Sequence, residues 1–249
     1  MCTMVILRRP AHSWPVLVAA NRDERSDRPW KAPARHWPDR PEVVGGIDEL
    51  AGGSWLALND TGVLAAILNR RGSLGPEAGK RSRGELVLEA LDHPDAHDAV
   101  GAMSDLNGLA YRPFNMVIAD NRDAYWLRHA GESAEVEIRP LPLGLSMLTA
   151  GDLNETSPRI RRYLPRFRDA AVPDPEAGDW NAWEALLAAR EHDESDPRAA
   201  MAIVTDGPFG TVSSSLIALP ALERHRKPIW RFCPAIPGAA PFGDVALGK

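Results

Sequence analysis

The stretch SWLALNDTGVLAAILN, residues 54–69, constrains the fold of this chain more than any other. Two apolar runs flank the four residues Asn59-Asp60-Thr61-Gly62. Asn, Asp and Gly are typical of tight turns between strands, because they tolerate the backbone angles that such turns need. The stretch therefore predicts a β-hairpin, and with it antiparallel pairing in this part of the chain.

Other short apolar runs predict further strands and helices in the same manner. Residues 2–7 and 15–20 predict a second hairpin whose second strand ends at Asn21, whereas residues 25–53 are rich in Pro and Gly and are expected to form loops. Ser82 and Glu85 predict a capping box at the start of a helix. The expected helices cover 81–91, 95–104, 157–170 and 180–192, and the other expected strands cover 114–120, 124–129, 135–141, 145–150, 210–220 and 228–233. Hairpins followed by helix pairs indicate an α+β fold in a single domain over 1–249.

Bulk properties exclude several classes of function. The net charge of -5 argues against a nucleic-acid partner, which requires clustered Lys and Arg. The arginines of PRIRRYLPRFR, residues 158–168, are read as a solvated helix face. No signal peptide and no apolar stretch of membrane-spanning length are apparent, and two cysteines make no disulfide framework. These observations predict a cytoplasmic protein without a membrane span. The close histidine pair His93 and His97 has no Cys nearby, and we expect no metal site.

Cys2 is the first candidate for chemistry. Removal of Met1 is favoured when the next residue is small, and the mature chain would then begin with Cys2. The thiol of such a residue is a nucleophile, and its own α-amine, with a pKa of about 7.7–8.0, can accept the proton. The alternative is that Cys2 is a small apolar residue of an N-terminal strand.

The cluster Asn21–Glu24 would lie beside Cys2 if the two N-terminal strands pair. The Arg22 guanidinium would favour the thiolate, and the Asp23 carboxylate would hold the α-amine. Asn69, at the end of the 54–69 hairpin, is a candidate amide donor to an oxyanion. The alternatives are an exposed salt-bridge cluster at 21–24 and a turn-forming role for Asn69.

Seven segments together resemble a known family. They are MCTMVI, NRDERSDRPWKAPARHW, GGSWLALNDTGVLAAILNRRG, KRSRGELV, FNMVIAD, LNETSPRI and FGTVSSSLI, and they span most of the chain. On these motifs the chain is identified as a member of the NRDE family, also called the transport-and-Golgi-organisation family. That family is similar to the cysteine branch of the N-terminal-nucleophile hydrolases, which contains bile-salt hydrolases and penicillin V acylases.

The resemblance implies a four-layer αββα sandwich with antiparallel sheets and a set of site residues. Cys2 would be the nucleophile and its amine the base, Arg22 and Asp23 the charge partners, and Asn69 the oxyanion donor. Asn21 and Glu24 would take the places of the charge partners if the register slips by one residue. Two positions depart from the family pattern, since Ala150 stands where an Asn is usual and Val212 where many relatives have Arg.

Three functions remain open at this point. The first is an N-terminal cysteine amidohydrolase that acts on a small amide and needs no cofactor. The second is a non-catalytic haem- or lipid-handling or trafficking protein on the same fold, with haem as a possible ligand. The third is a scaffold in which Cys2 is structural. The segment 25–41, with Trp30 and Trp37, would either wall a pocket for a small-molecule ligand or form a rigid surface loop. The oligomeric state is not indicated.

Overall fold

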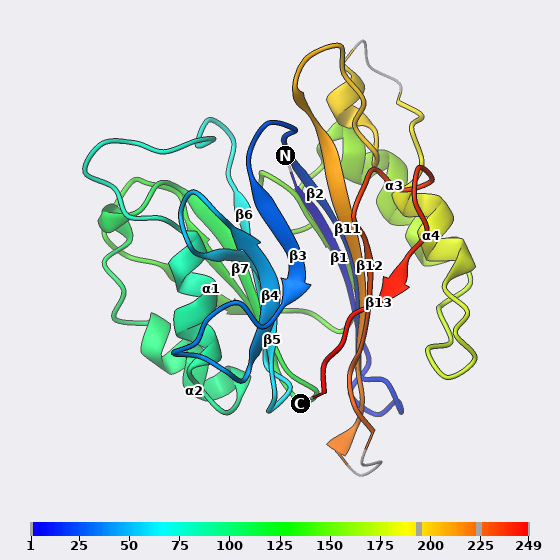
Figure 1. Cartoon of the computed structure of the whole chain (residues 1–249), viewed down its shortest axis with the longest axis horizontal. Helices are drawn as coiled ribbons and strands as arrows, with labels where there is room; N and C mark the ends of the chain where they lie inside the picture. The colour runs from blue at the N-terminus through cyan, green and yellow to red at the C-terminus, as the bar shows by residue number, and fades with distance from the viewer. Residues whose placement is uncertain (1, 193–195, 223–225, 249) are drawn as a thin grey trace. The chain divides into compact units, whose positions relative to one another are not determined.

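The computed structural model of the chain describes residues 2–192, 196–222 and 226–248. Its contacts group the chain into two compact units, each made of separate stretches of sequence. The first unit comprises 1–28 and 142–245, and the second comprises 29–141 and 246–249. Each unit contains one antiparallel sheet and its own helices (Figure 1). The fold is therefore α+β, as predicted, while the single domain over 1–249 stays a prediction.

The sheet of the first unit has six strands in the order β10-β1-β2-β11-β12-β13. The hairpin expected from 2–7 and 15–20 is present in this sheet, since β1 and β2 pair in antiparallel register with Thr3 opposite Asn21. The strands are β1 (Thr3–Arg8), β2 (Val16–Arg25), β10 (Gly144–Leu148), β11 (Phe209–Leu219), β12 (Ile229–Cys233) and β13 (Gly243–Asp244).

Helices cover one face of this sheet. They are α3 (Pro158–Asp169), α4 (Asn181–Leu187) and the short 3₁₀ helix η2 (Pro197–Ala199). Apolar side chains of alternate strand residues, such as Val5, Leu17 and Ala19, are buried against Phe167 of α3 and Trp183 of α4. Since successive residues of a strand point to opposite faces, this contact assigns the odd-numbered residues of β1 and β2 to the helix-covered face.

The sheet of the second unit has seven strands in the order β3-β4-β5-β6-β7-β8-β9. Helices α1 and α2 pack against it, and their apolar side chains share one core with the sheet (Figure 1). The strands are β3 (Trp30–Ala34), β4 (Val43–Asp48), β5 (Ser54–Asn59), β6 (Leu64–Asn69), β7 (Phe114–Ala119), β8 (Ala124–His129) and β9 (Glu137–Pro140); the helices are α1 (Gly84–Leu91), α2 (Ala96–Met103) and the 3₁₀ helix η1 (Gly108–Ala110).

The predicted hairpin at 54–69 is confirmed as β5 and β6. Its turn is held by the Asn59 side chain, whose Oδ1 accepts hydrogen bonds from Val63 N at 2.8 Å and from Thr61 Oγ1 at 2.8 Å. Gly62 has a φ of +93°, which residues with a Cβ rarely adopt. The turn residues are thus those that this connection requires.

The expected end of the second strand at Asn21 is wrong. Strand β2 continues through the whole Asn21–Glu24 cluster to Arg25. The reason is that β11 pairs with β2 over its full length, from Leu219 opposite Val16 to Phe209 opposite Arg25. The polar residues are therefore inside a sheet, and their partners come from distant parts of the chain.

The loop expected over 25–53 is also wrong, because it contains β3 and β4. Strand β3 lies at the edge of its sheet, where Pro33 is tolerated since its missing N–H faces no neighbour. Strand β4 contains Gly46 because the Trp55 ring packs over it, and a Cβ built on Gly46 would lie 2.1 Å from that ring. Here Gly and Pro mark close packing and a sheet edge.

The helix predicted over 81–91 begins at Gly84, and the capping box does not form. The residue before the helix is Arg83, whose side chain makes no capping hydrogen bond. The backbones of Gly53 and Gly84 approach so closely that a Cβ on Gly53 would lie 2.4 Å from Gly84 C. This close approach leaves no room for a side chain at position 53. The other expected helices are present, although α4 is shorter than predicted. Within the described ranges, no helix has the length and apolar character needed to cross a membrane.

Candidate functional site at the start of the first strand

Cys2 lies immediately before β1, at the level of the NRDE cluster of β2. Its Sγ lies 3.7 Å from the backbone oxygen of Asp23, to which the thiol donates a hydrogen bond. Since Thr3 is opposite Asn21, continuing the register by one residue places Cys2 beside Arg22. The structure thus brings Cys2, Arg22 and Asp23 together within one unit. Met1, whose removal the nucleophile hypothesis requires, lies outside the described residues.

The alternation of the strands divides the NRDE cluster between two faces of the sheet. Asn21 and Asp23 point to the helix-covered face, together with Thr3. Arg22 and Glu24 therefore share the other face with Cys2. In the sequence these four residues form one group, whereas in the structure only Arg22 and Glu24 can present side chains on the face of the thiol.

The Asp23 carboxylate is fully buried and holds two charged or polar partners. Its Oδ1 accepts a hydrogen bond from Thr211 Oγ1 at 2.6 Å, and its Oδ2 accepts one from Arg159 Nη1 at 3.1 Å. The side chains of Asp23 and Arg159 are 0% and 5% exposed, so this is a buried ion pair. A buried carboxylate is tolerated only with such partners, because burial without them carries a large desolvation cost.

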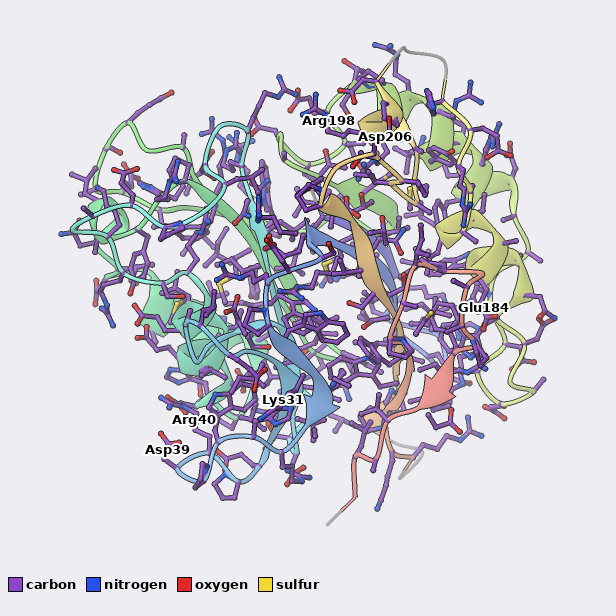
Figure 2. All side chains as sticks on the ribbon, turned by 45° about the horizontal axis from the view of Figure 1, so that its top comes forward. Lys31, Asp39, Arg40, Glu184, Arg198 and Asp206 are labelled. Carbon is purple, nitrogen blue, oxygen red and sulfur yellow. The ribbon has the colours of Figure 1, made fainter. Side chains whose placement is uncertain are left out.

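Arg159 is the residue of this site that the sequence analysis missed. It was read as part of a solvated helix face, yet its guanidinium is buried and also donates to Thr3 Oγ1 at 2.5 Å and to Arg198 O at 2.5 Å. Figure 2 places Arg198 on the segment between α4 and β11. A signal was present, since Arg159 precedes the buried Tyr163 by four residues and therefore shares its face of α3.

The start of α3 explains how the Arg159 side chain reaches the sheet. Ser157 is the N-cap, and its side chain accepts from Ile160 N at 3.4 Å, while Pro158 occupies the first turn. Arg159 is therefore held in the first turn of α3, from which its side chain reaches the Asp23 carboxylate.

The electrostatics around Cys2 keep the thiol protonated. Burial raises the pKa of the Cys2 thiol, and the nearby Asp23 carboxylate raises it further. The positive charge of the amino terminus, the hydrogen bond to the Asp23 backbone oxygen and the positive charge of Arg22 lower this pKa, but do not outweigh the first two. Cys2 therefore requires a base next to it before it can act as a nucleophile at neutral pH.

Asn21 is fully engaged in the packing of the first unit. Its Nδ2 donates to Leu187 O at 3.0 Å and to Met201 O at 2.9 Å, and its Oδ1 accepts from Ser214 Oγ at 2.5 Å. These bonds tie the end of α4 to the sheet. Glu24 is half-buried, and its Oε1 accepts from the backbone N–H of Arg25 at 2.9 Å.

The other sequence-predicted residues lie in the second unit. Asn69 is the last residue of β6 and is partly exposed. Trp30, on β3, contacts Trp55 edge to face at a centroid distance of 5.8 Å. Trp37 is buried in the core of the unit and donates from Nε1 to Gly52 O at 2.8 Å.

The two positions that depart from the family pattern lie in the first unit. Ala150 is buried after β10, and Val212 is the extra residue of a β-bulge between Thr211 and Ser213. The bulge shifts the register such that Thr211 faces Asp23 while Ser213 faces Arg22. Across the described ranges, no group of three or more His, Cys, Asp or Glu side chains is arranged to hold a metal ion.

Comparison with known proteins decides the family. The sequence matches the profile described as Transport and Golgi organisation 2 over residues 1–225. The chain belongs to the Transport and Golgi organisation 2 family. It is 31% identical over 147 residues to the Transport and Golgi organization 2 homolog of Mus musculus, and 33% identical over 147 residues to the homolog of Bos taurus. Each match covers 54% of this chain and 51% of the relative, so the chain spans about half the length of the curated relatives it matches.

Solved structures show that this family member has the fold of N-terminal-nucleophile hydrolases. The Caenorhabditis elegans N-acylethanolamine-hydrolyzing acid amidase ortholog superimposes with a TM-score of 0.58 at 13% identity, covering 87% of this chain and 92% of that one. Penicillin V acylase from Agrobacterium tumefaciens gives 0.52 at 14% identity, covering 94% and 83%. A mutant of the conjugated bile acid hydrolase from Clostridium perfringens gives 0.51 at 12% identity, covering 99% and 97%. The fold class predicted from the sequence is confirmed.

Proposed function

We propose that this chain is an N-terminal cysteine amidohydrolase that cleaves a small acyl amide after Met1 has been removed. The observation that carries the proposal is the position of Cys2, whose thiol lies against Asp23 and shares a sheet face with Arg22. The fold supports the proposal, because the similar structures are described as an amidase, an acylase and a conjugated bile acid hydrolase.

The reaction would proceed through an acyl-enzyme. The α-amine of Cys2 takes the proton of the thiol, and Sγ attacks the amide carbonyl carbon to form a C–S bond. The C–N bond then breaks, and the leaving amine takes the proton from the α-ammonium group. The α-amine of Cys2 then deprotonates a water molecule, which attacks the thioester. This releases the carboxylic acid, and the proton returns to the thiol. The cycle requires no cofactor.

The raised pKa of the thiol supports a role for the α-amine. Since burial and the Asp23 carboxylate hold Cys2 in the thiol form, the thiolate is scarce at neutral pH. A free α-amine on the same residue supplies a base of suitable pKa, about 7.7–8.0 in unperturbed peptides. With Met1 retained, that nitrogen is an amide and cannot accept a proton. The proposed activity therefore depends on processing of the chain.

The proposed substrate class is an acyl amide with an apolar acyl group. The similar enzymes are named for the hydrolysis of an N-acylethanolamine, a penicillin and a conjugated bile acid. Arg22 is the positively charged residue of the Asn21–Glu24 cluster on the face of Cys2, and its guanidinium is suited to bind the carbonyl oxygen as negative charge develops, or a carboxylate of the substrate. The oxyanion-donor role expected for Asn69 stays a prediction.

The first test concerns the thiol itself. Intact-mass measurement of the purified chain is expected to show the loss of Met1. A short pulse of iodoacetamide at pH 7.5 is then expected to label Cys2 faster than Cys233, which is buried and donates to the backbone oxygens of Ala235 and Ala240. Retention of Met1, or equal labelling of the two thiols, would contradict the proposal.

The second test concerns catalysis. The processed chain is incubated with a panel of fatty-acyl and aryl-acyl amides, and release of the amine is measured for wild type and for Cys2→Ala. Activity that is lost in Cys2→Ala supports the proposal. A processed, reactive Cys2 without turnover of any panel member, combined with stoichiometric binding of a hydrophobic ligand such as haem, would instead support a non-catalytic haem- or lipid-handling protein on the same fold.

A further inference from the structure

The buried Arg159 side chain connects α3 and η2 with Thr3, at the start of β1. One guanidinium nitrogen, Nη1, donates both to Asp23 Oδ2 at 3.1 Å and to Thr3 Oγ1 at 2.5 Å. Thr3 is the residue directly after Cys2, and Asp23 is the residue whose backbone oxygen the Cys2 thiol contacts. A single side chain of α3 therefore bridges the two strands at the level of the candidate nucleophile.

The second guanidinium nitrogen fixes the other end of this bridge. Arg159 Nη2 donates to the backbone oxygen of Arg198, in η2, at 2.5 Å. A planar guanidinium with three partners in fixed directions has little freedom to move. These hydrogen bonds thus fix the position of Thr3, and with it the backbone of Cys2, relative to the helices of the first unit.

We propose that Arg159 is a positioning residue for Cys2, which holds the start of β1 against Asp23 and offsets the negative charge of Asp23 beside the thiol and its α-amine. The inference rests on the proposed function in one respect only, namely that Cys2 is the reactive group. Arg159 touches no reacting atom in this arrangement and acts through Asp23 and Thr3.

The charges around the site determine the sign of the effect. Asp23 raises the pKa of Cys2, and Arg22 lowers it. Arg159 forms an ion pair with Asp23. The pKa of Asp196 is lowered mainly by its hydrogen bonds with Arg198, and the charge of Arg159 adds a smaller effect in the same direction. Removal of Arg159 therefore takes away the positive charge that is paired with Asp23, and the pKa of both the thiol and the α-amine should rise. Removal of the Asp23 charge should lower both.

The experiment measures the rate of Cys2 alkylation by iodoacetamide as a function of pH, on the processed full-length chain. In Arg159→Met, the midpoint of the rate profile is expected to move up by about one pH unit, because an uncompensated charge at short range shifts a pKa by about that much or more. Below both midpoints the rate then falls about tenfold. Arg159→Lys keeps the charge and is expected to recover most of the wild-type profile. Arg168→Met, an exposed arginine of the same helix, is the matched control and should leave the profile unchanged.

A second variant keeps the inference testable if Arg159→Met does not fold. Asp23→Asn is expected to move the midpoint in the opposite direction, to lower pH, while Thr3→Val removes the hydroxyl bridge without a change of charge and should move it little. A folded Arg159→Met or Asp23→Asn chain with the wild-type midpoint would overturn the inference and leave the proposed function intact. A wild-type chain whose Cys2 is not labelled at all would overturn the proposed function instead.

Discussion

Thr211 donates a hydrogen bond of 2.6 Å to the Asp23 carboxylate across 188 residues of sequence. The same hydroxyl accepts from Ile203 N at 2.8 Å, so it bridges the NRDE cluster and the segment that precedes β11. The β-bulge at Val212 is what aims Thr211 at Asp23 while Ser213 faces Arg22. The segment 210–214 (GTVSS) therefore packs directly against the Asn21–Glu24 cluster.

Replacement of Thr211 by Val is expected to destabilise the fold by about 1–3 kcal/mol, because a buried carboxylate oxygen and a buried N–H both lose their partner. Urea unfolding measured at pH 7.5 checks this. Thr211→Ser keeps the hydroxyl and should recover most of the loss. Destabilisation by Thr211→Ser as large as that by Thr211→Val would contradict this prediction, because a retained hydroxyl would then not recover the loss.

Asn21→Asp is expected to destabilise the chain by about 3 kcal/mol or more at pH 7.5, although it changes only one atom. The new carboxylate would face the backbone oxygens of Leu187 and Met201, to which the amide now donates. Because the pKa of such a carboxylate would be raised in the folded state, the penalty is present above that pKa and disappears as the pH falls through it. Unfolding midpoints of variant and wild type should therefore converge in acid, whereas exposed Asn181→Asp should show no such dependence.

How far the sequence determines this fold can be judged residue by residue. The turn at Asn59–Gly62 was predictable because its signal is local, with the Asn59 side chain and the positive φ of Gly62 acting within six residues. The extent of β2 was not predictable from local pattern. Asn21 and Asp23 are polar, and only partners such as Thr211 and Ser214, almost two hundred residues away, make their burial inside a strand favourable.

The site was predictable in the same uneven way. The register of β1 and β2 follows from two apolar runs, and it brings Cys2 to the NRDE cluster. The role of Arg159 could not be predicted, because a run of arginines in a helix is usually solvated. The local pattern does not show that the buried carboxylate of Asp23 contacts this side chain. A charged residue on the apolar face of a helix is the sequence signal that indicates a buried partner of opposite charge.

Gly46→Ala and Gly101→Ala are expected to act in opposite directions. A Cβ on Gly46 would lie 2.1 Å from the Trp55 ring, and displacement of this ring should cost about 1–3 kcal/mol. Gly101 is an exposed residue of α2 with a clear space around its Cβ direction, and Ala there should stabilise the fold by about 0.5–1 kcal/mol. Chemical unfolding of both variants checks the pair. Trp55→Leu should reduce the cost of Gly46→Ala, and an unchanged cost in that background would contradict the steric explanation.

His129 is expected to make the chain less stable in mild acid. Its ring is buried against Phe114 at a centroid distance of 5.6 Å, and burial lowers its pKa, as do the positive charges of Lys80 and Arg70. The unfolded chain then binds a proton at a higher pH than the folded chain. No penalty is present above the unfolded pKa of about 6.5, and stability falls as the pH drops through that value.

The expected loss of stability in acid can be isolated by His129→Phe, which retains an aromatic ring but cannot be protonated. Urea midpoints are measured from pH 8 to pH 5 for this variant, for wild type, and for the exposed His97→Gln as a control. Wild type and His97→Gln should lose stability in parallel below about pH 6.5, and His129→Phe should lose less. If all three curves have the same slope, proton uptake by His129 on unfolding does not contribute to the measured pH dependence. The buried His129 ring then does not determine the acid sensitivity of the chain.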